Sequence, residues 1–362
     1  MKPIKIIISG GGTGGHIFPA LAIAIGMQKI NLNTSILFVG AKGKMEMEKI
    51  PKAGFLIKGL WISGFQRSLS FENLLFPLKL VLSIIQAFRV LKKFKPNIVV
   101  GTGGFASGPL LWVAQLLDLP TLLQEQNSYP GFTNRILSKN ANRICVAYDG
   151  MEKFFPKSKI LLTGNPVRSN LVNLISSEKS KKHFDLNPKI KTLVVLGGSL
   201  GSKRINELIK SNLDLFNELD LQVLWQCGQL YYEKYKKDAS NKVVIKPFIS
   251  EMEQLYAAAD FIVSRAGAGS ISELSCVGRP ILLIPSPNVT ANHQYRNAQA
   301  LAKENAALMV EEKDLEEKFK KHFLVLVSDE STQQELKQNL KRLSRPNATQ
   351  NIIREIIQLN DK

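Results

Sequence analysis

The sequence predicts an α/β protein in which two domains each contain a parallel sheet covered by helices. Short apolar runs typical of strands alternate along the chain with segments of helical periodicity. Glycine-rich turns directly follow several of these runs, as they do where a buried strand passes into a helix. The strand-like runs are 4–8, 36–39, 98–100, 121–123 and 144–147 in the first half, and 192–196, 223–226, 261–263 and 281–284 in the second.

The turn Gly164-Asn165-Pro166 marks the expected domain boundary, because a turn of this composition coincides with a change in charge. Residues 1–165 contain 20 lysines and arginines against 7 acids, a net +13, whereas residues 166–362 contain 28 against 23, a net +5. We therefore expect one domain at 1–165 and a second at 166–344. A final amphipathic helix, within 345–362, is expected to pack back on the first domain.

The net charge of +18 favours an anionic partner, such as a phosphorylated substrate, nucleic acid or anionic lipid, without choosing among them. A membrane-spanning helix is not expected, because the most apolar stretch, 74–91, contains Pro77, Lys79 and Arg89.

The first glycine-rich turn, 10–15, leads from a strand-like run into a helix and predicts an anion site. Glycines let a ligand approach the backbone, and the helix N-terminus offers N–H groups and a positive partial charge. The spacing of Gly10, Gly12 and Gly15 also fits a dinucleotide site. Such a site needs an acid about 20 residues further on, and none occurs between His16 and Glu46. NAD is therefore not expected.

Further polar or glycine-rich turns, at 101–109, 125–127 and 197–201, follow later strand-like runs. Each alone could be a tight connection, but their recurrence at successive strand ends favours a ligand site. Segment 264–274 contains Ser270 and Glu273 at the spacing of a capping box. Alternatively, the helix N-terminus binds a diphosphate and Glu273 accepts hydrogen bonds from ribose hydroxyls. The spacing leaves both interpretations open.

The ordered set of motifs resembles the MurG family of bacterial N-acetylglucosaminyltransferases over almost the full length of the chain. The motifs are 11–16 with 19–22, 101–109, 125–127, 197–199, 264–274, and His293-Gln294 with Asn297. The resemblance implies a GT-B fold, with two Rossmann-like domains around a central cleft. It also implies transfer of N-acetylglucosamine from UDP-N-acetylglucosamine to the muramoyl 4-hydroxyl of undecaprenyl-diphospho-muramoylpentapeptide. The domain at 1–165 would bind acceptor and membrane, and the domain at 166–344 would bind donor.

The resemblance also implies roles for individual residues. His16 would be the base, although a histidine there could instead cap the helix or bind phosphate. Glu273 would hold the ribose, Phe248 and Ile249 the uracil, and Gln294 and Asn297 the sugar. The remaining donor contacts implied are Thr13, Gly14, Gly15, Asn127, Arg168, Ser199, Ala268, Gly269 and Ser270, of which Thr13 and Asn127 face the acceptor side. The acceptor loops would be formed by Gly12, Gly103, Gly104 and Ser107.

Two positions depart from the family pattern: Phe105 replaces a tyrosine of some relatives, and His293 replaces a glutamine. Neither changes the reaction expected. Inverting transfer needs a base and stabilisation of the departing UDP, which the helix dipole near Gly269 and the cation of Arg168 can supply. No Asp-x-Asp motif is present and Cys145, Cys227 and Cys276 lack metal spacing, so neither a metal nor another cofactor is expected.

The segment 74–95 combines apolar and cationic side chains as an interfacial helix does. We expect a membrane patch there, on a peripheral protein at the cytoplasmic face of the bacterial membrane that could meet other cell-wall synthesis proteins. A core helix with a solvated basic end is the alternative. Less favoured functions are a nucleotide-sugar epimerase and a nucleic-acid binder, because neither needs both the glycine loops and an apolar basic face. The patch residues are Leu75, Phe76, Lys79, Arg89, Lys92 and Lys93.

Overall fold

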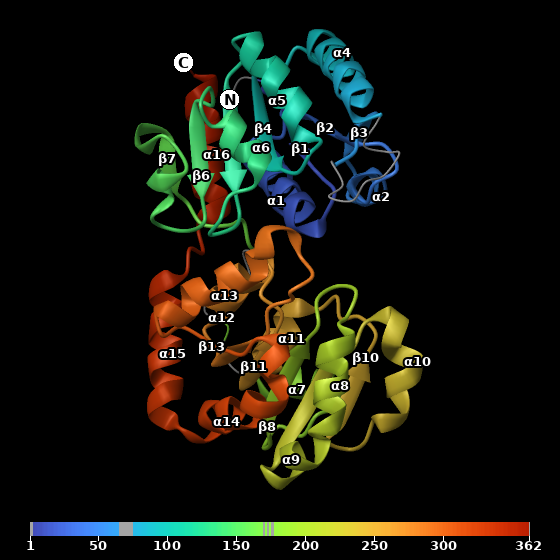
Figure 1. Cartoon of the computed structure of the whole chain (residues 1–362), viewed down its shortest axis with the longest axis vertical. Helices are drawn as coiled ribbons and strands as arrows, with labels where there is room; N and C mark the ends of the chain where they lie inside the picture. The colour runs from blue at the N-terminus through green and yellow to red at the C-terminus, as the bar shows by residue number, and fades with distance from the viewer. Residues whose placement is uncertain (1–2, 65–74, 169–170, 172–173, 175–176, 362) are drawn as a thin grey trace. The chain divides into compact units, whose positions relative to one another are not determined.

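The structure is a computed structural model that describes residues 3–64, 75–168, 171, 174 and 177–361. The chain forms two compact units (Figure 1): unit 1 comprises residues 1–167 and 345–362, and unit 2 comprises residues 168–344. The change of unit falls between Val167 and Arg168, two residues beyond the boundary expected from the sequence. Within the described residues, no helix is long and apolar enough to cross a membrane.

Unit 1 contains a parallel sheet with seven strands among the described residues, in the order β3-β2-β1-β4-β5-β6-β7. The strands are β1 (Lys5–Gly10), β2 (Ser35–Ala41), β3 (Leu56–Leu60), β4 (Ile98–Gly103), β5 (Thr121–Glu125), β6 (Arg143–Val146) and β7 (Ile160–Leu162). The helices are α1 (Gly14–Ile30), α2 (Glu46–Lys52), α4 (Phe76–Phe94), α5 (Ser107–Leu116), α6 (Phe132–Leu137), η1 (Met151–Lys153), η2 (Lys157–Lys159) and α16 (Ala348–Asn360).

Helices cover both faces of this sheet, because alternate strand residues point to opposite sides. Ile6 and Ile8 of β1 pack in one core cluster with residues of α1 and α16, whereas Ile7 packs in another with residues of α4 and α5. All three isoleucines are fully buried. The apolar run that predicted β1 is therefore a strand that is buried on both faces.

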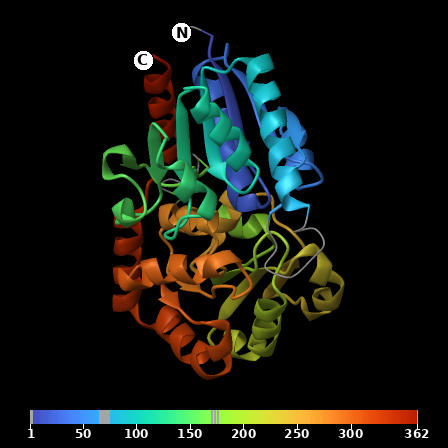
Figure 2. The ribbon, with the colours of Figure 1, turned by 45° about the horizontal axis from the view of Figure 1, so that its top comes forward.

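Helix α16 closes the sequence but lies against α1 of unit 1 (Figures 1 and 2). Gly26 of α1 permits the approach, because a Cβ there would lie 2.6 Å from Cδ1 of Ile353. Gly164, with φ +86°, similarly passes close to Arg345, where the chain re-enters unit 1.

Unit 2 contains a parallel sheet with six strands among its described residues, in the order β10-β9-β8-β11-β12-β13. The strands are β8 (Lys191–Leu196), β9 (Leu221–Gln226), β10 (Val243–Lys246), β11 (Phe261–Ser264), β12 (Ile281–Leu283) and β13 (Leu308–Met309). The α-helices are α7 (Glu178–His183), α8 (Lys203–Ser211), α9 (Leu213–Glu218), α10 (Tyr232–Tyr235), α11 (Met252–Ala258), α12 (Ala268–Val277), α13 (His293–Lys303), α14 (Leu315–Ser328) and α15 (Glu330–Leu343). The short helices are η4 (Gln229–Tyr231), η5 (Lys236–Asp238), η6 (Thr290–Asn292) and η7 (Glu312–Asp314).

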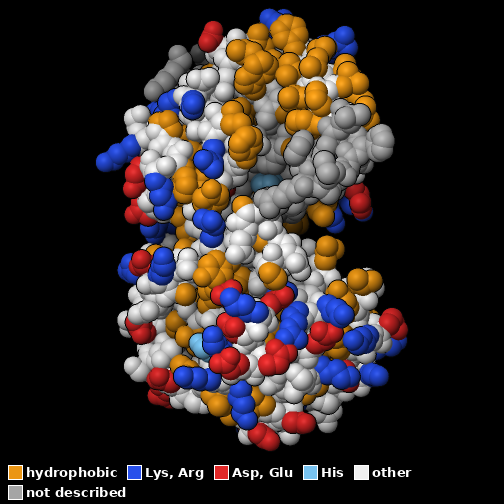
Figure 3. All heavy atoms as spheres, in the orientation of Figure 1, with side chains coloured by type: hydrophobic (Ala, Val, Ile, Leu, Met, Phe, Trp, Pro, Cys, Tyr) orange, Lys and Arg blue, Asp and Glu red, His pale blue; other side chains and the backbone are white. Residues whose placement is uncertain are grey.

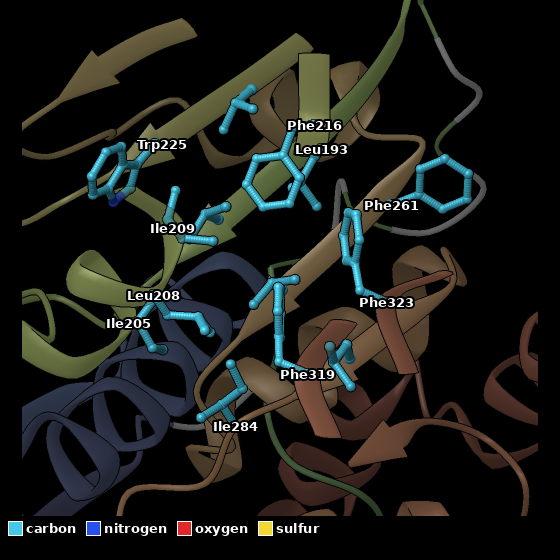
Figure 4. Packing of buried hydrophobic residues seen from close by; sticks show 14 of the residues in the cluster. Leu193, Ile205, Leu208, Ile209, Phe216, Trp225, Phe261, Ile284, Phe319 and Phe323 are labelled. Carbon is cyan, nitrogen blue, oxygen red and sulfur yellow. The ribbon is translucent and has the colours of Figure 1, made fainter. Parts of the chain in front are cut away.

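Aromatic rings fill one side of the unit 2 sheet (Figure 4). The ring of Phe323 lies 5.0 Å from that of Phe216 and 5.4 Å from that of Phe319, centroid to centroid. Trp225 is fully buried and its Nε1–H donates to Asn206 Oδ1 over 2.9 Å, so the indole keeps a polar partner inside the core. This packing gives a rigid base to the loops at the carboxyl ends of the strands.

Candidate active site

Two glycine loops meet at the carboxyl ends of β1 and β4 in unit 1. Gly10 pairs with Gly103 in the sheet. Gly103 and Gly104 have φ of +97° and +85°, and a Cβ on Gly104 would lie 2.3 Å from the carbonyl oxygen of Gly11. Only glycine allows both this backbone conformation and this approach. The predicted first and second loops therefore meet at one edge of the sheet.

His16 lies in the first turn of α1, against the second loop. Its Nδ1 is 3.0 Å from the carbonyl oxygen of Gly11, and its Nε2 would be 3.1 Å from a Cβ on Gly103. A carbonyl oxygen can only accept, so Nδ1 carries the proton of the neutral ring and Nε2 has the basic lone pair. Thr13 is the N-cap residue of α1. His16 is three residues beyond this cap position, and its Nδ1 lies 3.3 Å from Thr13 Oγ1. A contact with the helix start, a base and a phosphate ligand all remain chemically open to it.

Glu46, which was not among the predicted site residues, is fully buried beneath the first loop. Its Oε2 accepts the Gly12 N–H over 2.9 Å and its Oε1 accepts the Ala41 N–H over 3.0 Å. The backbone N–H of Gly12, a residue expected in the acceptor loop, is therefore held by a carboxylate of the protein itself. One sign of this role is present in the sequence, which is that Glu46 is an acidic residue shortly after β2.

A second buried carboxylate, Glu125, orders the third polar turn. Its Oε1 accepts the backbone N–H of Asn127 over 3.0 Å and the Asn127 side-chain amide over 3.2 Å. Its Oε2 accepts from Asn134 Nδ2 over 2.8 Å, and that same nitrogen would lie 3.7 Å from a Cβ on Gly103. Asn127 is thus oriented at the same sheet edge as His16.

Buried amides connect these loops to the turn at the unit boundary. Gln124 Nε2 donates to Asn165 Oδ1 over 2.8 Å, and Asn165 Nδ2 donates to the Gln126 carbonyl over 3.0 Å. Gln126 Nε2 donates to the carbonyl of Thr102 over 2.7 Å. Ser107, expected in the acceptor loop, is buried, and its hydroxyl donates to the Gly104 carbonyl over 2.8 Å. Its side chain therefore supports the loop from within.

In unit 2, the loops after β8, β9 and β10 are joined by Gln226. Its Nε2 donates to the Gly198 carbonyl over 3.1 Å and its Oε1 accepts the Ile249 N–H over 2.8 Å. The loops thus bring Ser199, which is exposed, to the same edge as Phe248, whose side chain is 56% exposed. Ile249 is buried, so its side chain contributes to the core and not to an open ligand surface.

The N-terminus of α12 is open. Gly267 is its N-cap residue and makes no side-chain cap, so the capping-box interpretation of Ser270 is wrong. The Ile271 N–H bonds back to Gly267 over 2.9 Å, and the N–H groups before it have no acceptor within the helix. A Cβ on Gly269 would meet no described atom within 4 Å. This end of α12 therefore suits an anion.

Glu273 follows one turn into α12 and is mostly buried. Its Oε1 lies 3.2 Å from Arg168 Nη1, and its Oε2 accepts the Tyr256 hydroxyl over 3.0 Å. Burial raises the pKa of this carboxyl, while the Arg168 charge and the Tyr256 hydrogen bond lower it. Glu273 and Arg168, which were expected at different parts of the donor, thus contact each other. Tyr256 is a contact that was not predicted from the sequence.

The helix α13 presents Gln294 to this site. Its Oε1 accepts the N–H of Ser286 over 2.9 Å and that of Ala266 over 3.3 Å. Asn297, one turn later, is fully buried. Arg265 lies in the motif 264–274 but was given no role from the sequence. Its guanidinium donates to the Ile284 carbonyl over 3.0 Å, to Ser202 Oγ over 2.6 Å, and to Glu312. It fixes the start of the loop that leads to α12.

Helix α4 has one face in the core and an apolar face exposed to solvent. Figure 3 shows hydrophobic side chains gathered over α4 and α5. Two residues of the expected patch are only partly exposed: Phe76 packs against the core, and Lys79 Nζ donates to Ser63 Oγ over 3.2 Å. Leu74 lies outside the described residues. The exposed members are Leu75, Leu78, Val81, Ile85, Phe88, Arg89, Lys92 and Lys93 on or beside α4, with Trp112 and Leu116 on α5.

Within the described residues, no group of three or more His, Cys, Asp or Glu side chains could hold a metal ion. Cys145 and Cys227 are buried, and Cys276 is partly buried. Burial raises the pKa of the Cys145 thiol to about 12, so this group stays protonated and unreactive.

The chain matches two family models, the glycosyltransferase family 28 N-terminal domain over residues 6–146 and the family 28 C-terminal domain over residues 192–352. Two relatives are named UDP-N-acetylglucosamine–N-acetylmuramyl-(pentapeptide) pyrophosphoryl-undecaprenol N-acetylglucosamine transferase. That of Flavobacterium psychrophilum is 50% identical and covers 99% of this chain and 98% of its own. That of Christiangramia forsetii is 52% identical and covers 98% of both.

The crystal structure of Acinetobacter baumannii MurG is similar to this chain with a TM-score of 0.79 and 28% sequence identity, covering 98% of this chain and 100% of that one. This likeness and the two parallel α/β units confirm the predicted GT-B architecture of two Rossmann-like domains.

Proposed function

Because the chain belongs to glycosyltransferase family 28, we propose that it is an inverting N-acetylglucosaminyltransferase. Its donor is UDP-N-acetylglucosamine, and its acceptor is the 4-hydroxyl of the muramoyl group in undecaprenyl-diphospho-muramoylpentapeptide. The names of its full-length relatives support this reaction. The structural observation that carries it is the open N-terminus of α12 with the Glu273 carboxylate one turn further on.

Unit 2 binds the donor in this proposal. The N–H groups of Ala268, Gly269 and Ser270 hold the diphosphate together with Ser199, because a helix N-terminus favours an anion. Glu273 accepts hydrogen bonds from the ribose hydroxyls, and the exposed ring of Phe248 covers the uracil beside the Ile249 backbone. Gln294 and Asn297 on α13 orient the sugar.

Unit 1 binds the acceptor and supplies the base. The loops at Gly103 and Gly104 receive the acceptor diphosphate, and the Thr13–Gly15 turn and Asn127 contact the sugar that is transferred. His16 Nε2 takes the proton of the acceptor hydroxyl, as its tautomer allows. The oxygen then attacks the anomeric carbon from the face opposite UDP, which inverts that carbon.

The bond from the anomeric carbon to the UDP oxygen breaks, and its electron pair leaves with UDP. The negative charge that develops there is stabilised by the α12 N-terminus and by the guanidinium of Arg168. Arg168 reaches the diphosphate once it releases Glu273. These residues can stabilise the leaving group by themselves, through fixed dipoles and one cation.

The exposed apolar face of α4 and the cations at its C-terminal end fit a peripheral contact with an anionic membrane. Such a contact would bring the enzyme to its lipid-linked acceptor, because the reactive hydroxyl of that acceptor stays near the membrane surface. We place the protein at the cytoplasmic face, where it serves peptidoglycan synthesis and, through it, cell shape and division alongside other cell-wall synthesis proteins.

Transfer of labelled N-acetylglucosamine from UDP-N-acetylglucosamine to an undecaprenyl-diphospho-muramoylpentapeptide analogue tests the reaction. We expect a β-linked product whose formation requires both substrates. Incubation with the nucleotide sugar alone should leave its configuration unchanged. Formation of an epimer without acceptor would replace the transferase by an epimerase.

A further inference from the structure

Tyr256 is buried in α11 and its hydroxyl is bonded to the carboxylate that we assign to the donor ribose. The side chain is 1% exposed, and its hydroxyl donates to Glu273 Oε2 over 3.0 Å. A buried phenol keeps a hydrogen-bond partner because an unsatisfied O–H is unfavourable. The contact joins α11 to α12 and leaves Oε2 in a fixed direction.

The two oxygens of Glu273 have partners of different character. Oε1 faces Arg168, whose side chain is 51% exposed and extends from the segment after β7, whereas Oε2 faces the rigid ring of Tyr256. A long exposed side chain such as that of Arg168 loses little free energy when it exchanges one partner for another. The buried hydroxyl of Tyr256 cannot reach water, so it has no replacement for the carboxylate. A ribose that approaches Glu273 therefore competes with Arg168 at Oε1 and leaves Tyr256 in place.

We propose that Tyr256 is a positioning residue for the donor: its hydroxyl fixes the Glu273 carboxylate so that Oε1 and the outer lone pairs are presented to the ribose hydroxyls. This inference rests on the proposed role of Glu273 in donor binding. Tyr256 touches neither substrate, and acts only through the carboxylate.

The contact also predicts how donor binding depends on pH. Glu273 accepts hydrogen bonds as a carboxylate, so donor affinity falls as the pH drops through the pKa of its carboxyl group. Among the described residues, the groups that act on this pKa are Arg168 and Tyr256, which both lower it against the effect of burial. Removing the hydroxyl raises the pKa of Glu273, so the loss of affinity on acidification begins at a higher pH.

The experiment measures UDP affinity by calorimetry from pH 4.5 to 8 for the full chain and for Tyr256→Phe. We expect the variant to bind UDP about 10-fold or more weakly at neutral pH, as for loss of a hydrogen bond to a charged group, and its acidic inflection to move to higher pH. In a Glu273→Ala background, Tyr256→Phe should have little further effect. Tyr235→Phe is the matched control, because Tyr235 is equally buried in unit 2 and packs against Trp225.

The outcomes separate the inference from the function on which it rests. If Glu273→Ala loses UDP affinity while Tyr256→Phe binds UDP with an unchanged affinity and pH profile, Tyr256 has no positioning role and the ribose assignment stands. If Tyr256→Phe weakens binding equally at all pH values and also in the Glu273→Ala background, its effect is one of packing and the inference is wrong. If Glu273→Ala binds UDP normally, the ribose assignment fails and the inference fails with it.

Discussion

The Glu46 carboxylate accepts the N–H of Gly12 over 2.9 Å, from a position 34 residues further along the chain. It simultaneously accepts the Ala41 N–H, so it fastens the first glycine loop to the end of β2. A Cβ on Gly11 would lie 2.1 Å from Glu46 Oε1, which explains why the loop needs glycine there. The conformation of the loop that carries His16 is therefore set partly by an anion that belongs to the protein.

Glu46→Gln should loosen this loop, because one of the two N–H donors would then face an amide NH₂ group. We expect the free energy of unfolding to fall by about 1–3 kcal/mol and hydrogen exchange at residues 10–17 to accelerate. Acceptor kcat/KM should fall, while the affinity for UDP itself should be unchanged, because the residues proposed to hold the uracil, ribose and diphosphate of the donor lie in unit 2.

Glu48→Gln is the control for this substitution. Glu48 lies two residues further along α2, where its exposed carboxylate pairs with Lys52. Equal exchange rates in the two variants would show that Glu46 does not hold the loop.

The core of unit 2 gives a separate stability prediction. Phe323 is fully buried against two other rings, so Phe323→Ala should lower the free energy of unfolding of unit 2 by about 3–5 kcal/mol. Val325→Ala on the same helix is the control, since Val325 is 36% exposed and should change stability little. Chemical denaturation measures both, followed by tryptophan fluorescence in a chain whose Trp61 and Trp112 are replaced by Phe, so that Trp225 alone reports on unit 2. If Phe323→Ala lowers the free energy of unfolding only slightly, the surrounding side chains must relax to fill the cavity that the ring leaves.

The sequence predicted the central strands of both sheets and missed the edge strands. In the described part of the chain, the unpredicted strands are β3 and β7 at the edges of the first sheet and β10 and β13 at the edges of the second. Edge strands are only partly buried, as the pattern of alternating exposed and half-buried residues in β3 illustrates. Their place depends on the neighbouring strand more than on their own composition, since β7 and β10 contain apolar runs as strong as that of β4.

The same distinction applies to the candidate site. The glycine loops and Glu273 belong to continuous motifs and could be found from the sequence. Glu46 and Tyr256 could not, because each is a single residue outside those motifs whose partner lies 34 and 17 positions away, respectively. Arg265 lies within the motif 264–274, but its partner Glu312 is 47 positions away, so its contact could not be found. Such contacts between residues far apart in the sequence form only in the folded chain, so they cannot be predicted from hydrophobic periodicity or from the composition of turns.

Membrane association should depend on the cations at the end of α4. Reversing Lys92 and Lys93 to Glu should release the protein from anionic vesicles, since each basic residue near such a surface contributes about 1 kcal/mol. Activity on a water-soluble acceptor analogue should be retained. The control reverses Lys320 and Lys321, which are exposed on α14 in unit 2 and change the net charge equally. Release by both double variants in vesicle sedimentation would indicate a general effect of net charge and no specific patch.

The role of His16 is tested by the balance between kcat and acceptor KM. If Nε2 deprotonates the acceptor hydroxyl, His16→Ala should lower kcat by about 10²–10⁴ with the donor KM nearly constant. His322→Ala is a matched control: His322 Nδ1 lies 2.9 Å from the carbonyl oxygen of Lys318, the same local arrangement on the surface of unit 2.

The alternative for His16 is that it binds the acceptor diphosphate as a cation. In that case the loss in His16→Ala should fall mainly on acceptor KM, and His16→Lys should restore most of it because an ammonium group still meets the phosphates. A lysine that is protonated at neutral pH cannot accept the hydroxyl proton, so it should not rescue kcat if His16 is the base. Full rescue of kcat by His16→Lys at neutral pH would therefore reject the base assignment and retain only the phosphate contact.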